Sequence, residues 1–175
     1  MTNKLIGNYK NGTYFVKIYE DGTKERITPD DIFEPAFAES MDMTITERCQ
    51  NKCSFCYANC TPQGKHADFS KYDYLIDSLH PYTELALNGN QITDIPGLED
   101  FLHKLKDKKV FANMTVNQID FEKNWKYLKR LSHEGLIHGL GISLNKVTDE
   151  LLTYIQFFPN AILHVIIGIN NNNSV

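Results

Sequence analysis

Short apolar segments and amphipathic segments alternate along most of this chain, and that alternation limits the folds that it can adopt. Apolar residues recur at helical spacing between segments that are apolar at nearly every position. Such segments are typical of parallel strands that helices bury on both faces. The sequence therefore predicts an α/β fold with five strands, over residues 41–46, 84–87, 110–116, 138–144 and 161–168.

Four amphipathic segments between these strands are predicted as helices. Asp94 and Pro96 suit the start of the second helix, and Thr148 suits the N-cap of the fourth. Gly135 follows the third helix, at a position where a left-handed residue is common. The apolar residues that define these helices are Tyr72, Leu75, Ile76 and Leu79; Leu98, Phe101, Leu102 and Leu105; Phe121, Trp125, Leu128 and Leu131; and Leu151, Leu152 and Ile155.

The beginning of the chain has a different pattern, with two segments rich in β-branched and aromatic residues. These segments flank Asp21 and Gly22, a dipeptide that suits the positive φ angles of a tight turn. A second turn signal, Asn11 and Gly12, precedes them. We therefore predict a β-hairpin or a small meander over residues 8–28.

The predicted hairpin and the alternating region suggest two parts of unequal size. An acidic, proline-containing stretch over residues 29–39 joins them. A length of 175 residues suits one domain, or one domain with a small appendage, and is enough to bury a substantial core. We therefore divide the chain into an N-terminal hairpin and linker, residues 1–40, and an α/β core, residues 41–175.

Composition and charge exclude some classes of function. The net charge is -4, with 42% hydrophobic and 23% charged residues, which argues against binding nucleic acid through phosphate neutralisation. Specific contact with RNA or with a nucleotide stays open. The sequence has no apolar stretch of the roughly 20 residues that span a bilayer, and its start does not resemble a secretion signal. We expect a cytoplasmic protein without a membrane partner.

Three cysteines, Cys49, Cys53 and Cys56, form a C-x3-C-x2-C pattern just after the first strand of the α/β region. A loop that leaves the end of a strand can bring three thiolates to one point, and thiolates are ligands for soft metals. An odd number of thiolates suggests an iron-sulfur cluster with one iron left open. Because all four cysteines of the chain lie within residues 49–60, a metal role fits better than disulfides.

Cys60 leaves other interpretations open. It could complete a four-thiolate zinc site, although structural zinc sites usually take their ligands from two separate pairs. It could equally close a four-cysteine electron-transfer cluster. We expect Cys60 to be a free thiol rather than a ligand.

The cysteine pattern, with the aromatic residue Phe55 directly before the third cysteine, resembles the radical S-adenosylmethionine (radical SAM) superfamily. The resemblance extends from about residue 41 to residue 168 and implies a partial (β/α) barrel with a 4Fe-4S cluster at the carboxyl ends of its strands. Such barrels usually have six strands, and this chain offers five. Either the sequence is a fragment, or a partner or the N-terminal hairpin fills the sixth position.

The resemblance also implies an activity. Cys49, Cys53 and Cys56 would hold three irons, and the fourth iron would bind the methionine part of S-adenosyl-L-methionine. An electron donor such as flavodoxin or ferredoxin would reduce the cluster. Reductive cleavage of the sulfonium would then give methionine and a 5′-deoxyadenosyl radical, which abstracts hydrogen from a substrate. The cofactor supplies this chemistry, and the protein supplies orientation and a dry cavity.

Further positions follow from the resemblance, one strand end at a time. The second strand would end in a turn that contacts the methionine amino group, and an amide, Asn90, replaces the family's acid there. The third would contribute a polar residue near substrate or the cofactor carboxylate, the fourth would contact the ribose, and the fifth would flank adenine. In chain order the cofactor-binding residues would be Phe55, Asn88, Gly89, Asn90, Asn117, Ser143, Asn145, Ile167 and Gly168.

The sequence identifies no substrate and no catalytic residue beyond these positions. Peptides, nucleosides and small metabolites all stay open as substrates. Two other functions compete with the radical enzyme. One is a non-catalytic metal-binding module in which Cys60 closes a zinc or iron-sulfur site, and the other is a cluster-free barrel that acts as a binding scaffold.

Overall fold

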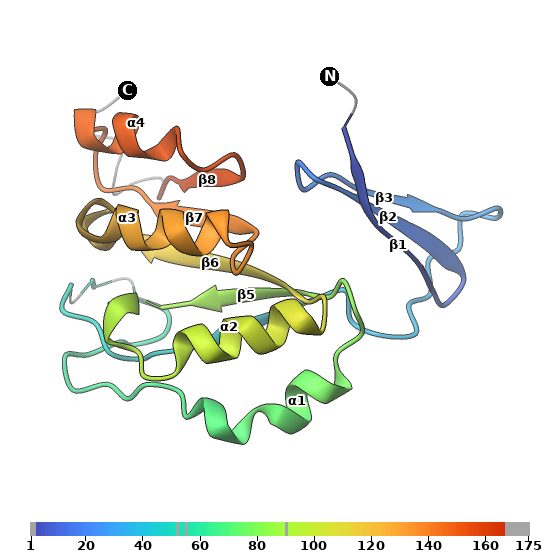
Figure 1. The fold of residues 1–175 in the computed structure, drawn as a ribbon, viewed down its shortest axis with the longest axis horizontal. Helices are drawn as coiled ribbons and strands as arrows, with labels where there is room; N and C mark the ends of the chain where they lie inside the picture. Colours follow the sequence, from blue (N-terminus) through green and yellow to red (C-terminus); the bar gives the residue numbers. More distant parts are fainter. Residues whose placement is uncertain (1–2, 52, 55, 90, 167–175) are drawn as a thin grey trace.

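The computed structural model describes residues 3–51, 53–54, 56–89 and 91–166, and these form an α/β fold with two sheets (Figure 1). The larger sheet is parallel, with its strands in chain order, and helices alternate with them. This confirms the α/β class, the five parallel strands and the interleaved helices. The strands of this sheet are β4 (Ser40–Thr44), β5 (Glu84–Asn88), β6 (Phe111–Asn117), β7 (Gly139–Ser143) and β8 (Ala161–His164).

The smaller sheet is antiparallel and belongs to the N-terminal segment. Its strands β1 (Leu5–Asn11), β2 (Tyr14–Tyr19) and β3 (Lys24–Ile27) follow one another as a meander. Gly12 and Gly22 have φ angles of 60° and 84°, as the turn signals predicted. Among the described residues these strands form a sheet of their own. The hairpin therefore does not supply a sixth strand to the parallel sheet.

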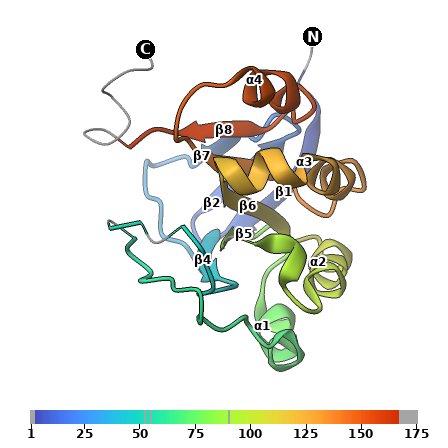
Figure 2. The same cartoon turned by 90° about the vertical axis from the view of Figure 1, so that its left-hand side faces the viewer.

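The helices lie on one face of the parallel sheet (Figure 2). In β5, β6 and β7 buried residues alternate with partly exposed ones, so the prediction of burial on both faces is wrong. The reason lies in the residues of the second face, which are polar or small, such as Asn113, Thr115 and Gly141. The helical segments are η1 (Phe69–Lys71), α1 (Asp73–Ser78), η2 (Ile92–Asp94), α2 (Leu98–Asp107), α3 (Gln118–His133) and α4 (Asp149–Ile155).

Local signals explain the start of α4 and the end of α3. The Thr148 hydroxyl accepts the Leu151 N–H at 3.0 Å and caps α4, and Gly135 follows α3 with a φ of 67°. The start of α2 differs from the prediction, because Asp94 lies in η2 and Gly97 is the residue that precedes the helix. The predicted start signals, Asp94 and Pro96, lie instead in a separate turn between β5 and α2.

The small sheet packs against the amino-terminal end of the parallel sheet. Tyr9 stacks on Tyr82, with 5.9 Å between ring centroids, and Lys24 forms an ion pair with Glu84 at the start of β5. The carboxyl ends of the parallel strands are therefore left for the cysteine loop. Among the described residues, no helix is both long enough and apolar enough to cross a membrane. The domain division at residue 40 stays a prediction.

Candidate functional site

The carboxyl ends of the parallel strands bring polar side chains to one edge of the sheet. The register pairs Thr44 with Asn88, Asn88 with Thr115, and Asn117 with Ser143. Side chains alternate between faces along a strand, so these residues point away from the helix-covered core that contains Leu87. Residues from four different strands therefore meet above one face of the sheet.

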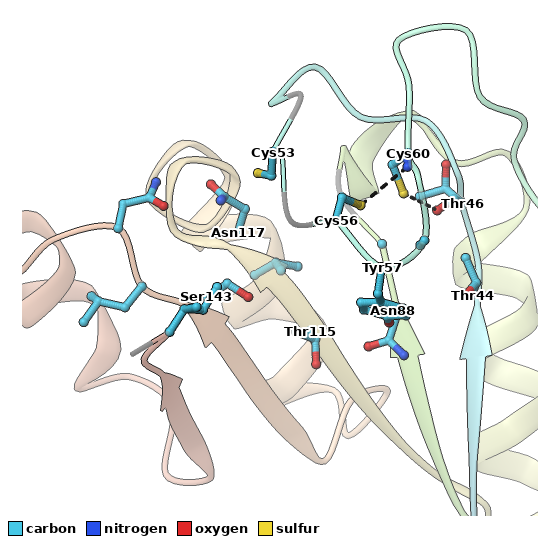
Figure 3. A pocket seen from close by; sticks show the side chains of 16 residues that line it. Thr44, Thr46, Cys53, Cys56, Tyr57, Cys60, Asn88, Thr115, Asn117 and Ser143 are labelled. Carbon is cyan, nitrogen blue, oxygen red and sulfur yellow. Dashed lines mark hydrogen bonds between the residues drawn. The ribbon is translucent and has the colours of Figure 1, made fainter. Parts of the chain in front are cut away.

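These strand ends and the cysteine loop enclose a cavity of about 500 Å³ (Figure 3). A volume of this size suits a ligand of a few hundred daltons. None of the described residues that line it is Asp, Glu, Lys, Arg or His, so hydroxyls, amides, thiols and apolar groups form its surface. The lining residues are Thr44, Thr46, Cys53, Cys56, Tyr57, Ala58, Cys60, Asn88, Gly89, Thr115, Val116, Asn117, Ser143, Leu144, Asn145 and Ile166.

Backbone hydrogen bonds close the base of the cysteine loop. The Glu47 N–H donates to the Lys65 carbonyl at 2.9 Å, and the Cys49 N–H donates to the Thr61 carbonyl at 2.9 Å. The Thr46 hydroxyl lies 2.9 Å from the His66 Nδ1 across the same base. The loop therefore leaves the end of β4 and returns to it, which holds the cysteines at the carboxyl edge of the sheet.

The thiols occupy different places on this loop. Cys49 is buried near the base, where the Asn51 N–H donates to its sulfur at 3.4 Å. Cys53, Cys56 and Cys60 line the cavity. Figure 3 shows Cys56 and Cys60 together and Cys53 apart from them, and the Cys60 N–H donates to the Cys56 sulfur at 3.5 Å.

The two adjacent thiols differ in acidity. The Cys60 N–H, followed by other backbone N–H groups, lowers the pKa of Cys56 below its ordinary value, because these donors stabilise the thiolate. Burial, followed by the charge of Cys56, raises the pKa of Cys60 to about 11. Cys56 is therefore the thiol of this pair that ionises first, as a metal ligand must.

The predicted convergence of Cys49, Cys53 and Cys56 on one point stays a prediction. Within the described part of the chain, no three His, Cys, Asp or Glu side chains are gathered in an arrangement that could hold a metal ion. The chemistry of the donor set nevertheless fits an iron-sulfur cluster, because all three proposed ligands are thiols and two of them face the cavity.

Gly89 is in the lining for a steric reason. A Cβ atom at this position would lie 2.6 Å from the Thr46 Cγ2, so a larger residue would displace the Thr46 side chain in the segment that follows β4. The neighbouring Asn88 also lines the cavity, and its amide donates to the Ala86 carbonyl at 3.5 Å. The turn that the sequence singled out thus lies beside the cysteine loop.

The polar residues predicted on the next two strands also reach the cavity. Ser143 and Asn145 line it, on β7 and on the loop that follows. Asn117 lines it too, but its Oδ1 accepts the Ile119 N–H at 2.8 Å and caps α3. Asn117 therefore has a structural role in addition to any contact with a ligand.

Four predicted positions lie outside the described residues, namely Phe55, Asn90, Ile167 and Gly168. Ile166, the last residue described in the fifth-strand segment, does line the cavity. Sequence reasoning missed Thr44, Thr46 and Tyr57 as lining residues. The alternation along β4 could have found Thr44, since it shares the face of the sheet that carries Asn88, whereas Thr46 lies past the end of that strand. Tyr57 had no such signal.

No protein-family model, no curated protein and no solved structure matches this chain. The residues of the cavity and the cysteine loop are therefore the basis for its proposed function.

Proposed function

We propose that this chain is a radical SAM enzyme, or the cluster-bearing core of one, in which Cys49, Cys53 and Cys56 hold a 4Fe-4S cluster and the cavity binds S-adenosyl-L-methionine. One observation carries this proposal. Cys53 and Cys56 line the same cavity as Asn88, Gly89, Asn117, Ser143 and Asn145, the strand-end positions that the resemblance implies for the cofactor. The five-stranded sheet would then be a partial barrel of the radical SAM type.

When bound, the reduced cluster supplies the electron that cleaves the sulfonium of S-adenosylmethionine and yields a hydrogen-abstracting 5′-deoxyadenosyl radical. The chain's own residues would bind and orient S-adenosylmethionine. Ser143 and Asn145 offer hydroxyl and amide groups that hydrogen-bond ribose hydroxyls, and Val116, Leu144 and Ile166 offer apolar surface for a flat base.

The test is anaerobic reconstitution of the full chain with iron and sulfide, followed by dithionite and S-adenosylmethionine. Dithionite stands in for the flavodoxin or ferredoxin that we propose as the electron donor. We expect the visible absorption of an iron-sulfur cluster and release of 5′-deoxyadenosine. The Cys53→Ala variant should lose both. Equal yields of 5′-deoxyadenosine from Cys53→Ala and wild type would refute the proposal.

A second function is favoured by the contact between Cys56 and Cys60. The Cys60 N–H donates to the Cys56 sulfur and Cys60 lines the cavity, and these two contacts support Cys60 as the fourth ligand in this second proposal. The chain would then be a non-catalytic module with a closed zinc or iron-sulfur site. Metal analysis with an absorption spectrum of Cys60→Ser separates the two. Loss of the metal from this variant, or a colourless zinc protein, favours the module.

A further inference from the structure

Gln118 is a buried polar residue at the start of α3, directly after the cavity residue Asn117. Gln118 is only 2% exposed, and both the oxygen and the nitrogen of its carboxamide form hydrogen bonds. The Oε1 accepts the backbone N–H groups of Asn145 and Lys146, at 2.8 and 3.0 Å. The carboxamide thus binds a loop that lies 27 residues further along the chain.

A second layer of hydrogen bonds fixes the other end of this carboxamide. The Gln118 Nε2 donates to the Glu122 Oε1 at 2.8 Å and to the Thr148 Oγ1 at 3.4 Å. The Thr148 hydroxyl in turn donates to the Glu122 Oε1 at 2.5 Å and accepts the Leu151 N–H. Gln118, Glu122 and Thr148 therefore tie the first turn of α3 to the first turn of α4.

The segment between β7 and α4 is the part of the chain that this network immobilises. Leu144 and Asn145 in this segment line the cavity, directly after Ser143 at the end of β7. Asn145 is itself exposed, so burial of its side chain does not fix its position. Its backbone N–H is instead held by the Gln118 Oε1 on the neighbouring helix α3.

We propose that Gln118 is a positioning residue for ligand binding, which holds the β7–α4 loop so that Ser143 and Asn145 face the cavity. This inference rests on the proposed function, because it assigns those two residues to an adenosine-containing ligand. Gln118 itself does not line the cavity in the described structure, so it acts through the loop.

The carboxamide is the group that this position requires. Two N–H donors need an acceptor, and the Glu122 carboxylate needs a donor, so one oxygen and one NH2 group satisfy both sides. Methionine has a similar shape but would leave the N–H groups of Asn145 and Lys146 without this acceptor. Exchanging the two residues, as Q118E/E122Q, keeps an acceptor for the loop and a donor between positions 118 and 122.

The experiment compares four forms of the full chain: wild type, Gln118→Met, Q118E/E122Q and Gln156→Met. Gln156 is an exposed glutamine directly after α4 that donates to the Leu152 carbonyl, and it serves as the matched control. Affinity for S-adenosylhomocysteine, which has no sulfonium to cleave, is measured by calorimetry. Hydrogen exchange of the Asn145 and Lys146 amides reports the loop directly, and thermal unfolding shows that each form is folded.

We expect Gln118→Met to bind S-adenosylhomocysteine about tenfold more weakly, with faster exchange at both amides. Q118E/E122Q should regain most of the affinity and the protection, and Gln156→Met should match wild type. If wild type binds but Gln118→Met binds equally well, or if Q118E/E122Q restores stability without affinity, the positioning role is wrong. If wild type itself does not bind, the proposed function fails first and this inference falls with it.

Discussion

Glu39 links the two sheets through a cluster of charged and polar groups, and its replacement gives a sharp test of that junction. Its side chain is 9% exposed, just before β4. Its carboxylate accepts a hydrogen bond from the Tyr14 hydroxyl at 2.5 Å. It also accepts hydrogen bonds from the Nε and the Nη2 of Arg26, at 3.1 and 2.7 Å. Lys24 lies 3.5 Å away and also pairs with Glu84. The change Glu39→Gln keeps the shape and removes the charge.

The expected loss of stability follows from these contacts. Removing one partner of a fully buried ion pair costs roughly 3–5 kcal/mol. The Arg26 side chain is 44% exposed and can be hydrated when its partner is lost, so we expect about 2 kcal/mol. For a chain of this length, that corresponds to a fall in Tm of about 4–8 °C.

Urea and thermal unfolding, followed by circular dichroism, measure this loss. Glu25→Gln is the matched control, because Glu25 also pairs with a lysine and a tyrosine on the small sheet, but its side chain is 48% exposed. An exposed pair of this kind contributes about 0.5 kcal/mol. A loss in Glu39→Gln no larger than that in Glu25→Gln would refute this account of the junction.

The pH dependence gives a second check on the same variant. Burial alone would raise the pKa of Glu39, but the hydrogen bonds from Arg26 and Tyr14 outweigh it and lower the pKa below its ordinary value of 4.5. The unfolded state therefore binds the proton first as the pH falls. The stability that Glu39 contributes is full above pH 4.5 and is lost as the pH falls through the folded-state pKa. The difference between wild type and Glu39→Gln should shrink over that range, and a constant difference would contradict the reasoning.

Two further predictions concern residues near the cavity. Gly89→Ala should destabilise the chain by about 1–3 kcal/mol in urea unfolding and weaken S-adenosylhomocysteine binding, because the new Cβ overlaps Thr46; unchanged stability and affinity would contradict this. Burial raises the pKa of Asp120, against the hydrogen bonds that it accepts from Ile92 and Asn124. Its protonated carboxyl group therefore contributes stability below pH 3.8 that is lost as the pH rises through the folded-state pKa. In urea unfolding, the free energy of unfolding of Asp120→Asn should therefore rise relative to that of wild type between acid and neutral pH. A difference in unfolding free energy that does not change with pH would count against this.

The sequence predicted the features that depend on neighbours along the chain. The alternation of apolar and amphipathic segments located the five strands, and Asp21-Gly22 located the turn between β2 and β3 because a glycine there accepts a positive φ. Once the strands were taken as parallel, Asn88 and Ser143 had to share one edge of the sheet. The start of α2 was wrong because Asp94 and Pro96 are turn signals as well as helix signals.

Other features of the site depend on segments that are distant in sequence, and only the tertiary structure decided them. The helices cover a single face of the sheet, which leaves the polar second face to form a cavity with the cysteine loop. Two contacts have no signal in the sequence around the residues that form them. They are the close approach of Gly89 to Thr46 and the hydrogen bonds from the loop after β7 to Gln118. Periodicity and φ preferences act over a few residues, whereas these contacts depend on how whole strands and helices pack. The sequence by itself therefore determined which groups stand at the strand ends, and the packing decided how they are held.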